Sequence, residues 1–199
     1  GPFQTLEDLP SGARVGTASV RRRALLLHHR PDLDIGLLRG NVNTRIAALQ
    51  DGQFDAIILA VAGLRRLGLD VDYAPLDLAV MPPSAGQGAL AIQTRDRDDP
   101  RSLAVMAASA DLGCAKTTTE VTAERALLGR LDGSCHTPIA ASATCDENGR
   151  LHLDGMILSE DGRQAFRDRI DGFGSDATQL GEALADQLLG AAGGRHFLA

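Results

Sequence analysis

One cysteine and a set of arginines are the residues of this 199-residue chain best suited to chemistry. Cys135 follows Leu131-Asp132-Gly133-Ser134, just past the end of a predicted helix. A thiol can bind a ligand covalently, and a guanidinium binds a carboxylate through two parallel hydrogen bonds. The combination predicts a polyanionic ligand that is tethered to sulfur and held by arginines.

The candidate arginines follow predicted strands rather than lying on the outer faces of helices. They are Arg21, Arg22, Arg39, Arg45, Arg66 and Arg95. In a parallel sheet, ligands bind beyond the carboxyl ends of the strands, where helix N-termini carry partial positive charge. We expect the first four to face one crevice, with the last two at its margin. The alternative for each is a surface ion pair with Asp32, Asp34, Asp51 or Asp55.

The surroundings of Cys135 argue against a cysteine hydrolase. A helix C-terminus disfavours a thiolate, and His136 is a neighbour on extended chain, so it points to the opposite face. On physical grounds alone, a buried structural thiol is the favoured interpretation of Cys135. Cys114 and Cys145 are interpreted as packing residues.

Composition excludes several classes of protein. The net charge is −6, and the +3 excess of residues 1–66 is local, so we expect no nucleic-acid partner. The 3 cysteines form no CxxC and no paired metal spacing, and an odd number argues against a disulfide framework. A reducing, cytoplasmic compartment fits. Because no apolar run reaches the length of a membrane span, we expect no membrane association.

The first 84 residues alternate between strands and helices, which predicts a parallel, right-handed βαβ sheet. Strands are expected at 13–17, 34–38 and 56–61, the last one buried on both faces. Ser19 is the expected cap of the first helix, and Asn43 or Thr44 that of the second. A small-residue turn such as 15–19 is also a general anion cradle, so Ser19 either donates to a carboxylate or only caps.

A break follows at Pro82-Pro83-Ser84-Ala85-Gly86-Gln87-Gly88, between strand-like stretches at 76–81 and 89–94. Its glycines either let the backbone approach a ligand closely or form a hinge without contact. A helix is expected near 103–110.

The remainder predicts a smaller α+β unit. Thr117 and Glu120 suggest a capping box for a helix that Gly133 closes. Strands at 139–144, 151–158 and 164–170, joined by turns at Asn148-Gly149 and Asp161-Gly162, should form an antiparallel sheet. A final amphipathic helix begins at Asp176. The fold class is therefore α/β, with units at 1–84 and 113–199 and a hinge and return segment at 85–112.

Three segments resemble the porphobilinogen deaminase (hydroxymethylbilane synthase) family: Val15-Gly16-Thr17-Ala18-Ser19-Val20-Arg21-Arg22, Leu38-Arg39-Gly40-Asn41-Val42-Asn43-Thr44-Arg45, and the stretch around Cys135. The resemblance implies a transferase of heme and tetrapyrrole biosynthesis, monomeric at full length. Its members condense four porphobilinogens into linear hydroxymethylbilane and release ammonia. The growing chain is built on a dipyrromethane cofactor, which the resemblance attaches to Cys135.

The resemblance also implies roles for other residues. Cofactor contacts would come from Ser19, Arg21, Arg22, Arg39, Gly40 and Arg45, and substrate contacts from Arg39, Arg45, Arg66, Gln87 and Arg95. No metal is implied. The family's catalytic aspartate belongs to a first domain that these residues do not match, so we expect no catalytic residue here and an inactive fragment. The alternative is a non-catalytic anion-binding module of periplasmic-binding-like fold.

Overall fold

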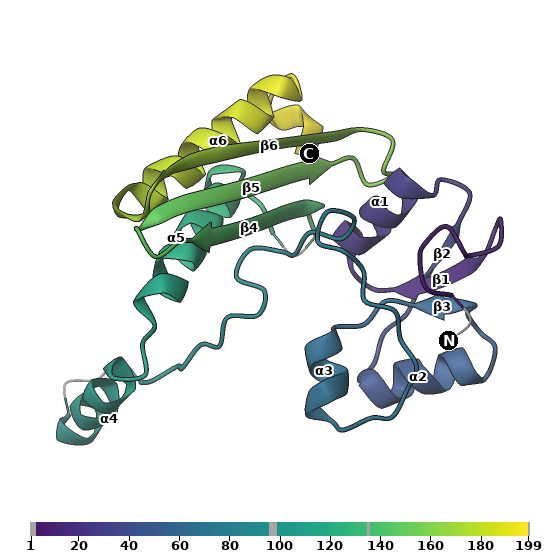
Figure 1. The fold of residues 1–199 in the computed structure, drawn as a ribbon, viewed down its shortest axis with the longest axis horizontal. Helices are drawn as coiled ribbons and strands as arrows, with labels where there is room; N and C mark the ends of the chain where they lie inside the picture. Colours follow the sequence, from purple (N-terminus) through teal and green to yellow (C-terminus); the bar gives the residue numbers. More distant parts are fainter. Residues whose placement is uncertain (1–2, 96–98, 135, 199) are drawn as a thin grey trace.

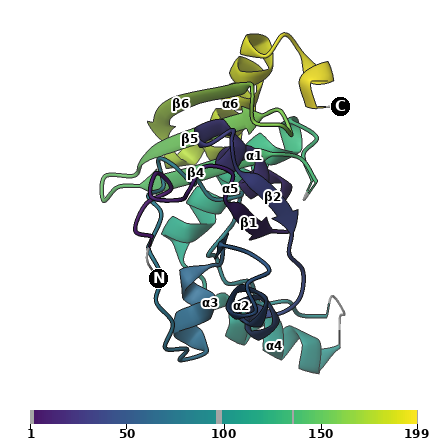
Figure 2. The same ribbon diagram turned by 90° about the vertical axis from the view of Figure 1, so that its right-hand side faces the viewer.

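The computed structural model describes residues 3–95, 99–134 and 136–198. Its strands form two separate three-stranded sheets, one parallel and one antiparallel. Helix α1 lies between the two sheets, and a long arm carrying α4 extends away from both (Figures 1 and 2). None of the helices in the described part of the chain has the length and apolar character needed to cross a bilayer.

The first sheet has the predicted parallel βαβ architecture. Its strand order is β2-β1-β3, and α1 covers one face while α2 and α3 cover the other (Figures 1 and 2). The elements are β1 (Arg14–Thr17), α1 (Val20–His29), β2 (Asp34–Leu37), α2 (Val42–Gln50), β3 (Ala56–Ile57) and α3 (Val61–Arg66). Val15 on the central strand is fully buried with Leu26 of α1. Burial of such side chains fixes the helices on the sheet.

Helix capping sets the start of α1 and α2. Ser19 Oγ accepts a hydrogen bond from Arg22 N at 3.3 Å, so the predicted cap is confirmed. The cap of α2 is Asn41, whose Oδ1 accepts from Thr44 N at 2.9 Å. The prediction of Asn43 or Thr44 was wrong because Asn41, directly after the glycine turn at Gly40, is the last extended residue and the helix already begins at Val42.

Of three further predicted strands, one is shorter than expected and two do not form. A strand requires a neighbouring strand to pair with. Among the residues that the structure describes, β3 pairs with β1 alone and ends at Ile57, so residues 58–61 do not continue a strand buried on both faces. Residues 76–81 form a turn, in which Asp77 O accepts from Met81 N at 2.8 Å. The Asp77 side chain also accepts from Ala79 N, which competes with strand pairing. Residues 89–94 adopt no regular structure, and Leu90 is 90% exposed.

The arm holds helix α4 (Pro100–Ala110), in agreement with the predicted helix. Asp99 caps it by accepting from Arg101 N and Ser102 N. Its apolar side chains Leu103, Val105 and Met106 are between 42% and 50% exposed. The apolar side of α4 is therefore not packed against any other part of the described chain.

The second sheet is antiparallel in the order β4-β5-β6, as predicted. The elements are α5 (Ala115–Arg130), β4 (Ile139–Cys145), β5 (Arg150–Leu158), β6 (Ala165–Phe173), η1 (Gly174–Asp176), α6 (Ala177–Ala191) and η2 (Arg195–Leu198). Leu127 of α5 and Leu184 of α6 pack with Leu153 of β5 in one buried cluster. The turn glycines Gly149 and Gly162 have φ of 75° and 71°, which glycine adopts without strain.

Both ends of α5 differ from the prediction. The helix begins at Ala115, so Thr117 and Glu120 lie inside it and form no capping box. At its C-terminal end Asp132 takes the left-handed conformation, with φ of 56°, in place of Gly133. A Cβ at position 133 would lie 2.6 Å from both Ile139 Cδ1 and Leu128 Cδ1, so the ends of these two side chains would have to shift to admit a larger residue.

The two sheets are joined through a shared apolar cluster. Ala24 and Leu25 of α1 pack with Ala140, Met156 and Leu158 of the second sheet. Arg167 of β6 adds a hydrogen bond to Ala79 O at 3.1 Å. Helix α1 thus contacts the second sheet on the side away from β1, and the two halves hold each other in place.

Candidate anion-binding pocket

Arg21 occupies the first turn of α1 and is buried, with 6% of its surface exposed. Its Nη1 donates to Pro82 O, and its Nη2 donates to Gln87 Oε1 at 3.0 Å. These two acceptors belong to residues 82–88, here named the connecting segment. The guanidinium is therefore held by neutral oxygens and not by a carboxylate.

Arg22 lies beside Arg21 and reaches the first sheet. Its Nη1 donates to Ile58 O at 3.1 Å, just beyond the end of β3. Among the described residues, Arg21, Arg22, Arg39 and Arg45 make no ion pair with an aspartate or glutamate. The surface ion-pair alternative instead describes Arg14 with Asp34 and Arg30 with Asp32.

Burial gives the two arginines an unusual electrostatic state. Desolvation, with a smaller contribution from the charge of Arg22, lowers the pKa of Arg21 to about 10. Desolvation also lowers the pKa of Arg22, and Arg45 adds repulsion. Both side chains remain cationic at neutral pH, so two poorly solvated positive charges lie close together. Such a pair attracts an anion strongly because little water screens it.

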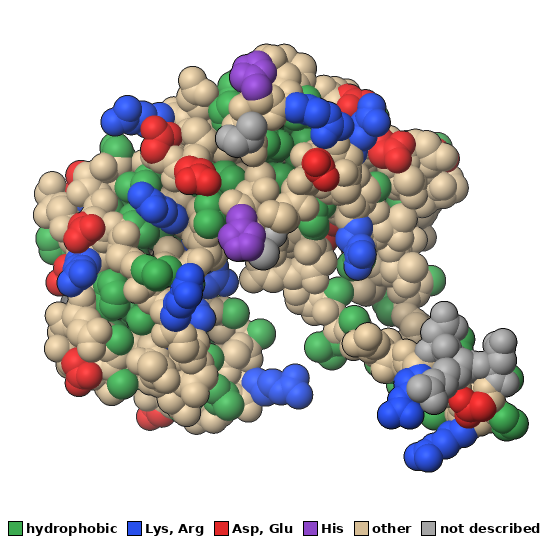
Figure 3. All heavy atoms as spheres, turned by 180° about the vertical axis from the view of Figure 1, so that it is seen from behind, with side chains coloured by type: hydrophobic (Ala, Val, Ile, Leu, Met, Phe, Trp, Pro, Cys, Tyr) green, Lys and Arg blue, Asp and Glu red, His purple; other side chains and the backbone are tan. Residues whose placement is uncertain are grey.

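A pocket of about 1060 Å³ opens in front of Arg21 and Arg22. One wall comes from residues 58–62 and another from the connecting segment, while Glu124 and Ser142 of the second half close it. Seen from behind, Lys and Arg side chains border the open hollow between the first-sheet half and the α4 arm (Figure 3). The pocket is large enough for a ligand with several carboxylates.

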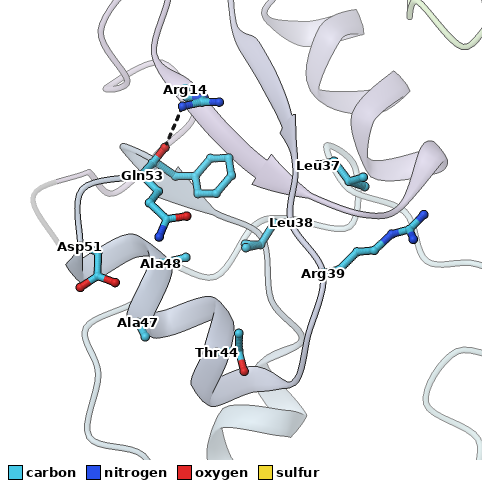
Figure 4. Close-up of a pocket in the computed structure, with 10 residues that line it drawn as sticks. Arg14, Leu37, Leu38, Arg39, Thr44, Ala47, Ala48, Asp51 and Gln53 are labelled. Carbon is cyan, nitrogen blue, oxygen red and sulfur yellow. Dashed lines mark hydrogen bonds between the residues drawn. The ribbon is translucent and has the colours of Figure 1, made fainter.

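Arg39 lines a different depression. That depression measures about 550 Å³ and lies between α2 and the edge strand β2, with Leu37, Thr44 and Phe54 in its wall. Figure 4 shows the Arg39 side chain extending away from α2, whereas Arg14 lies at the opposite end beside Gln53. The structure thus places Arg39 apart from the pocket that Arg21 and Arg22 line.

The other predicted contacts vary in their surroundings. Arg45 donates from Nε to Gly40 O at 2.9 Å, and Gly40 itself adopts φ of 109°. Arg66 ends α3 and is exposed, and Arg95 is exposed on the arm. The Ser19 oxygen serves the helix cap. Gln87 is the predicted residue that the structure brings into direct contact with Arg21.

The cysteines have separate settings. Cys135 lies outside the described residues. Cys145 is a buried free thiol in the second core, which confirms its packing role. Cys114 is exposed at the start of α5, so the prediction that it packs was wrong. Hydrogen bonds from Thr117 lower the pKa of its thiol.

Glu124 is a pocket residue that the sequence did not single out. It is buried, with 8% of its surface exposed, and burial raises the pKa of its carboxyl against the effect of two backbone donors. Glutamates on helices usually face solvent, so its residue type alone did not single it out. The available signal was its spacing, since it follows Glu120 by four residues on the helix face that meets β4.

Comparison with known proteins assigns both halves to one family. Residues 2–102 match the family model described as porphobilinogen deaminase, dipyromethane cofactor binding domain. Residues 118–190 match the one described as porphobilinogen deaminase, C-terminal domain. The first match covers the α1 arginines and the connecting segment, and the second covers most of α5 and the second sheet.

Individual relatives agree. The chain is 49% identical over 195 residues to the porphobilinogen deaminase of Trichlorobacter lovleyi, covering 98% of this chain and 61% of that protein. It is 49% identical over 191 residues to that of Pelobacter propionicus, with 96% and 60% covered. For that of Nitrobacter hamburgensis the identity is 45% over 195 residues, with 97% and 60% covered. The chain spans about 60% of the length of these relatives, and it belongs to the porphobilinogen deaminase family.

Proposed function

We propose that this chain supplies the cofactor-binding and ligand-binding part of a porphobilinogen deaminase. The complete protein would condense four porphobilinogens into hydroxymethylbilane and release ammonia. The observation that carries the proposal is the Arg21 and Arg22 pair, which is cationic, poorly solvated and without a carboxylate partner among the described residues. Pyrrole rings with acetate and propionate arms supply the carboxylates that such a pair lacks.

The residues present fit a dipyrromethane cofactor. It carries several carboxylates, and the pocket offers two guanidiniums whose remaining N–H donors are not used by acidic side chains. Bound through Cys135, the cofactor supplies the pyrrole end to which further units are joined. The part of the chain itself is to hold carboxylates and fix ring positions, because tethering and orientation raise the effective concentration of the reacting groups.

We assign the remaining contacts by their distance from this pair. Gln87 would contact ligand directly from the connecting segment, while Arg45 would add positive charge beside Arg22. The outer contacts to later pyrrole units would be Arg39, Arg66 and Arg95, with Ser19 and Gly40 shaping the turns that carry the arginines. Arg39 would make this contact once the growing pyrrole chain extends past the rim of the pocket toward β2.

The proposal also divides the chain and places it in the cell. Residues 1–84 and 113–199 act as two units, and 85–112 as the return segment that would complete a further domain. The proton-exchanging aspartate would come from outside these 199 residues. Exposed Cys114 suits a reducing, cytoplasmic compartment, and we propose a monomer that needs no nucleic acid or membrane.

The test uses the complete protein containing this chain. Intact mass should reveal a dipyrromethane adduct that disappears in Cys135→Ser, and acidic aldehyde reagent should give a pyrrole colour only with the unsubstituted protein. Ammonia release on adding porphobilinogen measures turnover. A protein that binds porphobilinogen but carries no adduct and releases no ammonia would instead be a non-catalytic binding module.

A further inference from the structure

Glu124 connects three parts of the molecule. Its Oε2 accepts from Gly86 N at 2.6 Å, and its Oε1 accepts from Ala143 N at 2.8 Å. Among the described residues it has no cationic partner. A buried carboxylate usually needs strong compensation, and here two backbone donors provide it. The side chain therefore joins α5 to β4 and to the connecting segment.

The connecting segment passes this restraint on to Arg21. Gly86 has φ of 71°, and the next residue, Gln87, accepts from Arg21 Nη2 at 3.0 Å and from Ser84 N at 3.1 Å. A further hydrogen bond, which Ala141 N donates to Pro83 O at 3.0 Å, also connects the segment to β4. Figure 1 shows the segment running between β4 and α1. A shift of Gly86 would thus move the side-chain oxygen that orients Arg21.

We propose that Glu124 is a positioning residue, which fixes the connecting segment so that Gln87 and Pro82 keep the Arg21 guanidinium directed into the pocket. The functional part rests on the proposed binding of carboxylates at this pocket, whereas the link from Glu124 to Arg21 does not. Through the connecting segment, Glu124 links the helix preceding Cys135 to the arginine that receives the ligand.

The chemistry requires a carboxylate at this position. Both partners are N–H donors, so both side-chain oxygens must accept. Glutamine has the same shape but only one oxygen, and its amide group would face a backbone N–H with another donor. Glu124→Gln therefore releases either Gly86 or Ala143 without changing side-chain volume.

Glu120 provides the matched control. It lies one turn earlier on α5, and its Oε1 accepts from Cys145 N at 2.8 Å. Glu120→Gln makes the same chemical change on the same helix and strand, without touching the connecting segment. Gln87→Ala is the second variant, since it removes the acceptor of Arg21 while leaving Glu124 and its two donors in place.

Three measurements on the 199-residue chain test the proposal. Hydrogen exchange at Gly86 and the Arg21 side-chain Nε–H resonance report the link, and calorimetric titration with porphobilinogen reports ligand affinity. In Glu124→Gln we expect faster exchange at Gly86, a shifted Arg21 signal and roughly tenfold weaker affinity, the loss of about one hydrogen bond. Glu120→Gln should leave the exchange at Gly86 and the Arg21 signal unchanged, and it should not weaken binding, because Glu120 also lines the pocket and its loss removes a negative charge that repels the ligand. Gln87→Ala should weaken binding without faster exchange at Gly86.

The outcomes separate the link from the function of the pocket. If the unsubstituted chain fails to bind porphobilinogen, the proposed ligand is wrong, and the Arg21 resonance alone then decides the link. An Arg21 signal that is identical in Glu124→Gln and Glu120→Gln overturns the positioning role. Unchanged porphobilinogen affinity in Glu124→Gln also overturns the positioning role. If Glu124→Gln does not fold, unchanged affinity in Gln87→Ala overturns it instead.

Discussion

Gly162, in the turn between β5 and β6, touches the last turns of α1 at His28. The His28 Nδ1–H donates to Gly162 O at 3.0 Å, and a Cβ on Gly162 would lie 2.6 Å from His28 N. The same Cβ would lie 2.5 Å from Ala24 O. The second sheet therefore meets, at its hairpin tip, the helix whose first turn carries Arg21 and Arg22.

Gly162→Ala should destabilise the chain much more than Gly149→Ala. Both glycines have left-handed backbones, with φ of 71° and 75°, but nothing lies within 4 Å of a Cβ on Gly149. The strain alone should lower the free energy of unfolding by about 1 kcal/mol for Gly149→Ala. Gly162→Ala adds a backbone clash and should cost roughly 3 kcal/mol. Urea unfolding measures the loss of stability in both variants. Equal losses would mean that the Gly162 turn is not in close contact with α1.

Arg22→Leu should weaken porphobilinogen binding, and Arg23→Leu should not. Arg22 is partly buried at the pocket, whereas the next residue, Arg23, is exposed. Loss of a charged hydrogen bond is worth about 1.5–3 kcal/mol, or roughly 10- to 100-fold in affinity. Calorimetric titration of the two variants compares neighbouring arginines in the same helix turn. Similar losses in both would indicate a general charge effect.

Binding of a tricarboxylate should decline when the pH rises past about 10. The protonated Arg21 is the form that binds an anion, and its pKa is lowered to about 10, so this contribution is complete below that pH and fades above it. Tyr73 also lines the pocket, so the titration is made in a Tyr73→Phe background that removes its hydroxyl. Constant affinity from pH 8 to pH 11 would argue that Arg21 does not contact the ligand.

The 199-residue chain by itself should bind porphobilinogen but release no ammonia. Guanidinium groups hold carboxylates, but they do not exchange protons near neutral pH, as ammonia expulsion requires. Intact mass should accordingly show Cys135 without an adduct. Robust ammonia release would show that a group within the chain, such as Glu124, takes over the proton transfer.

Sequence periodicity predicted the elements that are stabilised by local or repeated patterns. The parallel βαβ order, the Ser19 cap and the antiparallel sheet with its two glycine turns were all correct. Residues 56–61 and 89–94 were assigned as strands from apolar character alone. A strand also needs a partner for its backbone groups, and within the described parts of the chain β1 alone provides one, for Ala56 and Ile57.

The site was predictable only in part for a related reason. Arg21 and Arg22 were expected together because residues after parallel strands share an edge of the sheet, whereas Gln87 was expected from the family resemblance. The structure brings these three residues to one pocket. The motifs did not indicate that Arg39 lies apart from these residues, because Arg39 lines the separate depression between α2 and β2. Glu124 stayed hidden because its role depends on the close approach of Gly86 and Ala143, which are 38 and 19 residues away in the chain.

The α4 arm is a place where the chain can be cut without separating its two halves. The chain leaves for the arm near Gly88, just after Gly86 contacts Glu124, and it rejoins the second half at Ala115 on the same helix. The two halves also share the cluster of Ala24, Leu25, Ala140, Met156 and Leu158. A single proteolytic cut within the arm would therefore leave two fragments that remain associated, and fragments made separately should reassemble through the same contacts.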